Sequence, residues 1–236
     1  MALSQAEFGR AVEGLEGAWR EVLGDEPGVC SNEEVEWESV ELRTDEMQLG
    51  TRYLRIRREV QTHGQVLEDG GDKVEHEDEG VVEEEDPEAL LPPARPKPDN
   101  HSPGRIAIYD IVHSPSYQVP VLYLTFSEPR TIKSVPLPTI DEIYQMLVPD
   151  SFKTPMRDVG IMGALSMADH PISGAPAFFV HPCRTQDVMT ALSDDYDKPD
   201  IAEHYLMLWL GAIGGSVGLS VPVSVAQTLA KKRGEA

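Results

Sequence analysis

The segment from Asp169 to Cys183 reads DHPISGAPAFFVHPC and combines a turn, a short strand and a cysteine. Residues 177–180 form an apolar run that predicts a buried strand. Because Pro182 lacks a backbone N–H and biases His181 toward an extended conformation, strand pairing is expected to end at this dipeptide. The residues that predict the preceding turn are Pro171, Gly174 and Pro176.

Cys183 follows the strand directly and precedes a helical pattern, with Thr185 as a candidate N-cap and Asp187 in the first turn. The partial positive charge at a helix N-terminus favours a thiolate over a thiol. Cys183 is therefore a candidate nucleophile, and His181 is a candidate supporting residue on the same side of the extended segment. The alternatives are a buried apolar cysteine and a purely structural histidine.

The chain of 236 residues carries 41 acidic and 20 basic side chains, and its formal net charge is -21. This sign of charge argues against binding to a nucleic-acid backbone or an anionic membrane and favours a basic protein partner. The length is sufficient for one large domain or two small ones with a sizeable core.

Cys30 and Cys183 are the two cysteines of the chain, too few for a disulfide framework. Residues 1–20 carry glutamates within their apolar spacing, which is not the pattern of a signal peptide. The longest apolar stretch, residues 205–219, is too short and too rich in glycine to span a bilayer. We therefore expect a cytoplasmic protein.

Apolar spacing predicts a mixed order of helices and strands. Ser4 and Glu7 form a capping-box pattern ahead of a helix over residues 5–23. Strict alternation predicts two amphipathic strands, and two longer apolar runs predict the central pair of the sheet, joined as a hairpin. These strands are expected around Val35 and Trp37, around Leu54 and Ile56, and over residues 106–112 and 119–126. Further elements are expected at 139–147 (helix), 163–168 (strand), 185–192, 200–212 and 223–232 (helices).

Residues 62–104 differ from the rest of the chain in composition. They hold 13 acidic and 3 basic residues, and six prolines lie between positions 87 and 103. Such a segment cannot bury enough apolar surface to offset its ordering, so it is expected to be a disordered insertion. The chain then forms a single α+β domain over residues 1–236, interrupted by residues 62–104, with the insertion either inert or a tether for a partner.

Two common classes of site are disfavoured by spacing. His170, His181 and His204 lack companion ligands at metal spacing, so no metal or other cofactor is expected. Gly214, Gly215 and Gly218 do not follow a strand in a dinucleotide-binding pattern.

Four segments together resemble the autophagy-related ubiquitin-conjugating-type enzymes. Residues 116–123 read SYQVPVLY, residues 170–174 read HPISG and residues 178–185 read FFVHPCRT, and the layout of residues 205–222 agrees. The HPC motif is shared by two sister branches, autophagy-related proteins three and ten. The YQVP and HPI segments favour the branch of protein ten. The resemblance covers about residues 105–222.

The resemblance implies a ubiquitin-conjugating-enzyme-like antiparallel sheet with helices packed on it, and a transferase that works through Cys183. Cys183 would accept the modifier autophagy-related protein twelve as a thioester from the activating enzyme, autophagy-related protein seven. The acceptor would be a lysine of autophagy-related protein five. The alternatives are conjugation of the lipidated modifier, autophagy-related protein eight, and a non-catalytic interaction module on the same fold.

One departure concerns the donor for the oxyanion. Ordinary ubiquitin-conjugating enzymes carry an HPN motif, whereas the only asparagines here, Asn32 and Asn100, lie far from Cys183 in the sequence. A backbone N–H or a hydroxyl would have to replace that asparagine. His181 is expected either to orient the loop, to aid proton transfer or to pack, and His170 to shape the turn. The candidate hydroxyls are those of Tyr109, Tyr123, Ser166 and Thr185.

Overall fold

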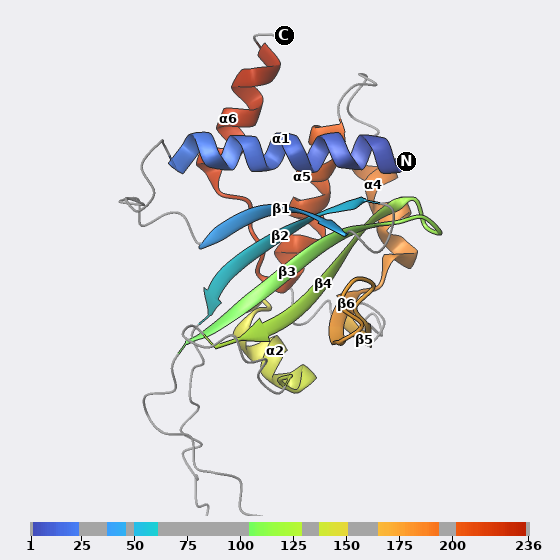
Figure 1. The fold of residues 1–236 in the computed structure, drawn as a ribbon, viewed down its shortest axis with the longest axis vertical. Coiled ribbons are helices and arrows are strands. Elements are labelled where there is room, and N and C mark those ends of the chain that lie inside the picture. Colours follow the sequence, from blue (N-terminus) through green and yellow to red (C-terminus); the bar gives the residue numbers. More distant parts are fainter. Residues whose placement is uncertain are drawn as a thin grey trace, which may run out of the picture.

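The computed structural model describes residues 2–23, 37–45, 50–60, 104–128, 137–150, 165–193 and 202–234. These residues form one antiparallel sheet of six strands in the order β1-β2-β3-β4-β6-β5, with helices packed on it (Figure 1). The predicted α+β fold is confirmed, and β3 and β4 are the central strands as expected. The strands are β1 (Ser39–Asp45), β2 (Thr51–Val60), β3 (Arg105–Ser114), β4 (Val119–Ser127), β5 (Leu165–Asp169) and β6 (Pro176–Val180).

The helices surround the sheet at its ends and on one side. They are α1 (Gln5–Leu23), α2 (Ile140–Met146), α4 (Thr185–Ser193), α5 (Ala202–Ala212) and α6 (Val223–Gly234), with 3₁₀ turns η2 (Pro182–Arg184) and η3 (Gly214–Val217). In Figure 1, α1 crosses above β1 and β2, and α5 runs behind the sheet. None of the helices in the described ranges is both long and apolar enough to cross a membrane.

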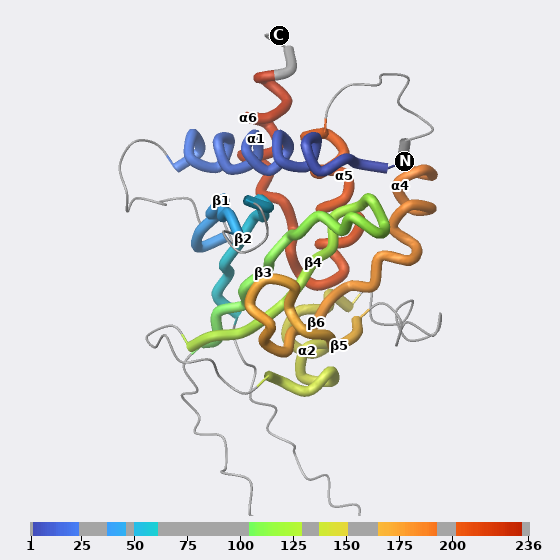
Figure 2. Tube along the Cα trace, turned by 45° about the vertical axis from the view of Figure 1, so that its right-hand side comes forward, coloured from blue at the N-terminus to red at the C-terminus, as the bar shows by residue number. Residues whose placement is uncertain are grey.

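Helix α1 begins and ends where its sequence predicts. The Ser4 backbone N–H donates to the Glu7 carboxylate at 2.8 Å, and the Ser4 hydroxyl accepts from the Glu7 backbone N–H at 3.3 Å, which completes the capping box. Phe8, Leu15 and Trp19 lie on the buried stripe of the helix. Helix α1 packs against α5 and α6 and against the first two strands. Figure 2 shows α1 crossing α5 and α6 above β1 and β2.

The two faces of the sheet carry different side chains. On the helix side, cross-strand partners Ile56, Tyr109, Leu124 and Phe178 are buried in the main hydrophobic core. On the other side, cross-strand pairing aligns a single row that we call the outer row. Its members, from β1 to β5, are Glu41, Arg55, Asp110, Tyr123, Phe179 and Ser166.

The first strand begins later than its pattern predicts. Trp37 precedes β1 instead of lying within it, and its ring packs against Trp19 with centroids 5.8 Å apart. The backbone N–H of Glu38 then donates to Arg57 O at 2.7 Å, where the ladder starts. The alternation is interrupted after Trp37, where Glu38 and Ser39 are both polar, and it resumes at Val40 with the apolar residues on the other positions. This interruption marks the boundary that the predicted strand overlooked. Val35 and Cys30 lie outside the described residues, as do positions 62–103 of the predicted insertion. Gly104 is described and directly precedes β3.

Candidate active site

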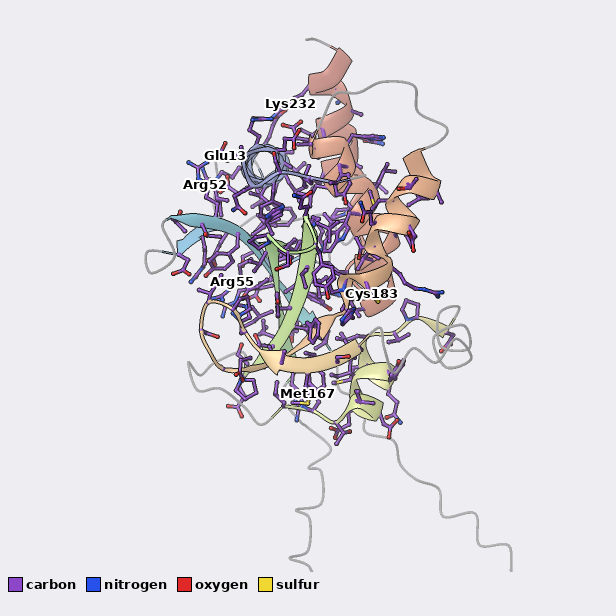
Figure 3. All side chains as sticks on the ribbon, turned by 90° about the vertical axis from the view of Figure 1, so that its right-hand side faces the viewer. Glu13, Arg52, Arg55, Met167, Cys183 and Lys232 are labelled. Atoms are coloured by element: carbon purple, nitrogen blue, oxygen red, sulfur yellow. The ribbon has the colours of Figure 1, made fainter. Side chains whose placement is uncertain are left out.

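Cys183 lies in the turn that connects β6 to α4. β6 ends at Val180, His181 keeps an extended backbone (φ -65°, ψ 126°), and Pro182 opens the 3₁₀ turn that contains Cys183. The end of strand pairing at His181 and Pro182 is therefore confirmed. Cys183 is exposed and is a free thiol. Figure 3 shows it at the foot of α4, on the side of the molecule away from Arg55.

His181 caps this turn through its imidazole. Its Nδ1 accepts a hydrogen bond from the backbone N–H of Cys183 at 3.1 Å. The prediction that Thr185 is the N-cap is wrong, because the 3₁₀ turn continues directly into α4 and the cap is four residues earlier. Thr185 is instead the first residue of α4, and its side chain is buried. A ring that accepts through Nδ1 is uncharged and carries its hydrogen on Nε2.

A continuous row of rings leads from the centre of the sheet to His181. His170 meets the edge of the Tyr123 ring at 5.1 Å between centroids, and Tyr123 stacks on Phe179 at 5.9 Å. Phe179 then contacts His181 at 5.9 Å, and Tyr117 from the β3–β4 turn meets His181 edge-on at 6.0 Å. His181 is thus held between two aromatic side chains as well as by its hydrogen bond. Burial raises the pKa of the Tyr123 hydroxyl, so this phenol stays neutral near neutral pH.

A buried charged group lies at the other end of the ring row. Arg55 makes a two-pronged contact with Asp110, with Nε to Oδ1 and Nη2 to Oδ2 both at 2.7 Å. Nε2 of His170 lies 3.0 Å from Oδ2 of the same carboxylate. Burial alone would raise the pKa of Asp110, but the hydrogen bonds and charge of Arg55, together with the neighbouring His170, lower it overall. Arg55 correspondingly has its pKa raised, chiefly by its hydrogen bonds to Asp110.

His170 shapes its turn, as expected, and does more. Its Nδ1 accepts from the backbone N–H groups of Ile172 at 3.2 Å and Ser173 at 3.3 Å. Since Nδ1 is the acceptor, the ring hydrogen is on Nε2, which faces Asp110. Arg55 is not simply a solvent-facing residue of β2, because its strongest partner is a buried carboxylate on β3.

The N-terminal segment fixes the turn that carries Tyr117. The backbone N–H of Leu3 donates to Gln118 O at 2.8 Å. Nε2 of His113 lies 2.6 Å from Leu3 O, so this ring nitrogen donates to the carbonyl. His113 is buried and its ring packs on Phe8 at 5.7 Å. The start of α1 and the β3–β4 turn are therefore tied together beside the ring of His181.

The four hydroxyls that could assist the oxyanion are placed differently. Tyr109 is buried on the helix side of the sheet and donates to Val217 O at 3.0 Å, so it does not face the outer row. Thr185 is buried two residues after Cys183. Tyr123 and Ser166 lie on the outer row, on β4 and β5. Asn32 and Asn100 lie outside the described residues.

No set of three or more His, Cys, Asp or Glu side chains in the described part of the chain is arranged to hold a metal ion. The chemistry available at the candidate site is that of an exposed thiol on a capped turn.

Residues 7–224 match the family described as autophagocytosis associated protein, active-site domain. The ubiquitin-like-conjugating enzyme ATG10 of Gibberella zeae is 35% identical over 193 residues, which cover 75% of this chain and 76% of the relative. The chain belongs to the ATG10-like family of autophagy conjugating enzymes. The ATG10 of Homo sapiens is 33% identical over 123 residues, covering 50% of this chain and 51% of that protein. A crystal structure of the autophagic E2 Atg10 aligns with 92% of this chain and 98% of its own at 13% identity, with a TM-score of 0.43.

This ATG10-like protein is accordingly a transferase of the ubiquitin-like conjugation reactions of autophagy, with a ubiquitin-like modifier and a substrate as its partners. Sequence reasoning identified the stretch around Cys183 but missed the group formed by Arg55, Asp110 and His170. The one available signal was Asp110 itself, a carboxylate inside the otherwise apolar run of β3. Its partners are 55 and 60 positions away, so no local pattern joins them.

Proposed function

We propose that Cys183 is the residue of this conjugating enzyme that carries the modifier. The observation that carries this proposal is the free, exposed thiol on a turn capped by His181, directly after the end of β6. The preceding Pro182 and the side-chain cap restrict the backbone at this point, which favours a fixed thiol position.

The chemistry runs in two transfers. The Cys183 thiolate attacks the carbonyl carbon of the modifier's C-terminal glycine, and the cysteine thiolate of the activating enzyme leaves. A lysine ε-amine of the acceptor then attacks the new thioester, its proton is lost, and Cys183 leaves as the thiolate. Aminolysis requires the lysine to be held close and the developing oxyanion to be stabilised. Tyr123 and Ser166 are the side-chain candidates for that donor on the outer row.

The modifier is proposed to be autophagy-related protein twelve, the activating enzyme autophagy-related protein seven, and the acceptor a lysine of autophagy-related protein five. Similarity to relatives named ATG10 supports this choice over conjugation of autophagy-related protein eight. The reaction is proposed for the cytoplasm, where thiols stay reduced.

The test is a charging assay with the activating enzyme, modifier and ATP, followed on non-reducing gels. The expected result is a band that reductant removes, absent with Cys183→Ala and retained with Cys30→Ala. Cys183→Ser should instead form an oxyester that survives reductant. Charging in the Cys183→Ala protein, or its loss in Cys30→Ala, would refute the assignment. Substituting autophagy-related protein eight for protein twelve tests the choice of modifier.

A further inference from the structure

The β5–β6 hairpin, which leads directly into Cys183, has a short backbone attachment to the rest of the sheet. β5 and β6 pair with each other along their whole length, from Leu165 opposite Val180 to Asp169 opposite Pro176. Within the described residues, β6 pairs with β4 at two positions only, where Tyr123 lies opposite Phe179 and Leu124 opposite Phe178. Backbone pairing over so short a length leaves the angle of the hairpin weakly determined. Side chains must therefore contribute to fixing it.

His170 makes the principal polar side-chain attachment, from the turn of the hairpin. Both His170 and Asp110 are 2% exposed, so the contact between Nε2 and Oδ2 excludes water. Because Nδ1 is occupied by the N–H groups of the turn, the orientation of the ring fixes the turn relative to β3. Arg55 in turn holds both oxygens of the carboxylate, so the acceptor cannot rotate away.

Stability alone does not account for this arrangement. A buried ion pair is often no more stabilising than apolar side chains of similar volume, because both charges lose their water. What such a pair adds is directional geometry. His170 is also the first of a series of rings in contact. It contacts Tyr123, Tyr123 stacks on Phe179, and Phe179 contacts His181, which caps Cys183.

We propose that Arg55, Asp110 and His170 form a clamp that fixes the β5–β6 hairpin on the central strands and thereby sets the position of Cys183. The three are positioning residues, since none of them contacts the thiol. The catalytic consequence rests on the function proposed for Cys183. Small displacements of a reacting group cost rate, so loosening the clamp should slow transfer to the acceptor lysine more than it slows charging.

Two substitutions at His170 separate its two contacts. Asn places an oxygen near the position of Nδ1, so His170→Asn keeps the turn acceptor and loses the 3.0 Å contact with Asp110. Gln places an N–H near the position of Nε2, so His170→Gln keeps a polar contact with Asp110 and loses the turn acceptor. Met167→Ala is the matched control, because Met167 lies on β5 of the same hairpin and is 57% exposed.

The variants are compared in single-turnover discharge of the charged enzyme onto the acceptor. We expect His170→Asn to discharge about tenfold more slowly than the unmodified protein, and His170→Gln and Met167→Ala to remain within about threefold. His170→Asn has already lost the contact with Asp110. The double variant His170→Asn/Asp110→Asn should therefore discharge only slightly more slowly than His170→Asn alone. Equal discharge by His170→Asn and His170→Gln, or multiplying effects in the double variant, would overturn the clamp.

A second readout does not need the modifier. In a Cys30→Ala background, the rate at which iodoacetamide alkylates Cys183 should change by about threefold or more in His170→Asn and stay near the starting rate in His170→Gln. An identical alkylation rate in both variants would count against the clamp. If the unmodified protein failed to charge, the proposed function would fail, and the alkylation rates would still decide whether the clamp positions the thiol.

Discussion

The imidazole of His181 accepts a hydrogen bond from the backbone of Cys183, with Nδ1 and N 3.1 Å apart. The histidine therefore acts on its neighbour through the conformation of the turn. A protonated imidazole would carry a hydrogen on Nδ1 and lose this bond. His181 therefore cannot cap the turn and stabilise the thiolate by a positive charge at the same time.

Substitution at His181 separates the cap from the ring. Asn at this position can still accept from the Cys183 N–H, whereas Ala cannot. We predict that His181→Ala lowers the free energy of unfolding by about 1 kcal/mol and slows discharge several-fold, while His181→Asn largely restores both. Chemical denaturation and single-turnover discharge are the measurements. Equal impairment by Asn and Ala would assign the effect to ring packing with Phe179 and Tyr117.

Asp110 makes stability depend on acidity in a defined direction. Its pKa in the folded protein is below the ordinary value of 3.8, so the unfolded chain binds the proton more readily. Its contribution is therefore complete above the ordinary value and is lost as pH falls through the lowered one. We predict that Asp110→Asn costs about 3 kcal/mol near neutral pH, because it leaves the Arg55 charge half-buried without its partner.

The pH dependence of that difference is the check. Free energies of unfolding from urea titrations should show a steady difference between the two proteins from about pH 7 to about pH 5, and a shrinking difference as pH is lowered below the ordinary value of 3.8. A difference that stays constant as pH falls below 3.8 would mean that the charge of Asp110 does not contribute.

Gly218 occupies a position that no other residue fits. Its φ is +74°, and a Cβ would lie 2.6 Å from Leu147 O and 2.9 Å from the Arg58 guanidinium, which also contacts Gly218 O. We predict that Gly218→Ala lowers the free energy of unfolding by about 2 kcal/mol or more. Gly211→Ala is the control, since a Cβ on this exposed residue of α5 meets nothing within 4 Å. It should raise stability by up to about 1 kcal/mol, and a melting curve of each variant tests both signs.

The segment between β2 and β3 should be removable. Val60 and Arg105 are cross-strand partners, so the two ends of the segment are already held side by side. Joining residues 65 and 101 with a short Gly/Ser link should stabilise the fold by about 1 kcal/mol or less, because loop closure depends weakly on length. It should also leave charging intact, in line with our proposal that the chain is one domain interrupted here. Thermal melting and the charging assay decide, and a loss of transfer alone would identify the segment as a partner-binding element.

Local patterns predicted most of the elements. The capping box at Ser4 marked a helix start that the structure confirms, because its partners are three residues apart. Thr139 and Glu142 form the same arrangement at the start of α2. The apolar runs of β3 and β4 indicated the central strands, because a central strand is buried on both faces and consecutive residues are therefore apolar. The start of β1 was missed because Trp37 is apolar for its contact with Trp19, a residue of α1.

The site was only partly within reach of such patterns. The position of Cys183 after a strand-ending proline followed from adjacent residues. The capping role of His181 did not, because an extended histidine before Pro182 can face either the thiol or the backbone. The partnership of Asp110 with Arg55 and His170 depends on the pairing of β2 with β3 and on the fold of the β5–β6 turn, neither of which a local pattern contains.

The three tryptophans of the chain are Trp19, Trp37 and Trp209. All three are buried in the core between the sheet and the helices, and none belongs to the β5–β6 hairpin. Intrinsic indole fluorescence of this protein therefore reports on the core between the sheet and the helices. It does not report directly on the β5–β6 hairpin that precedes Cys183. A solvatochromic dye on that thiol, read against the indole signal in one sample, would show whether the reactive end loosens before the rest of the molecule melts.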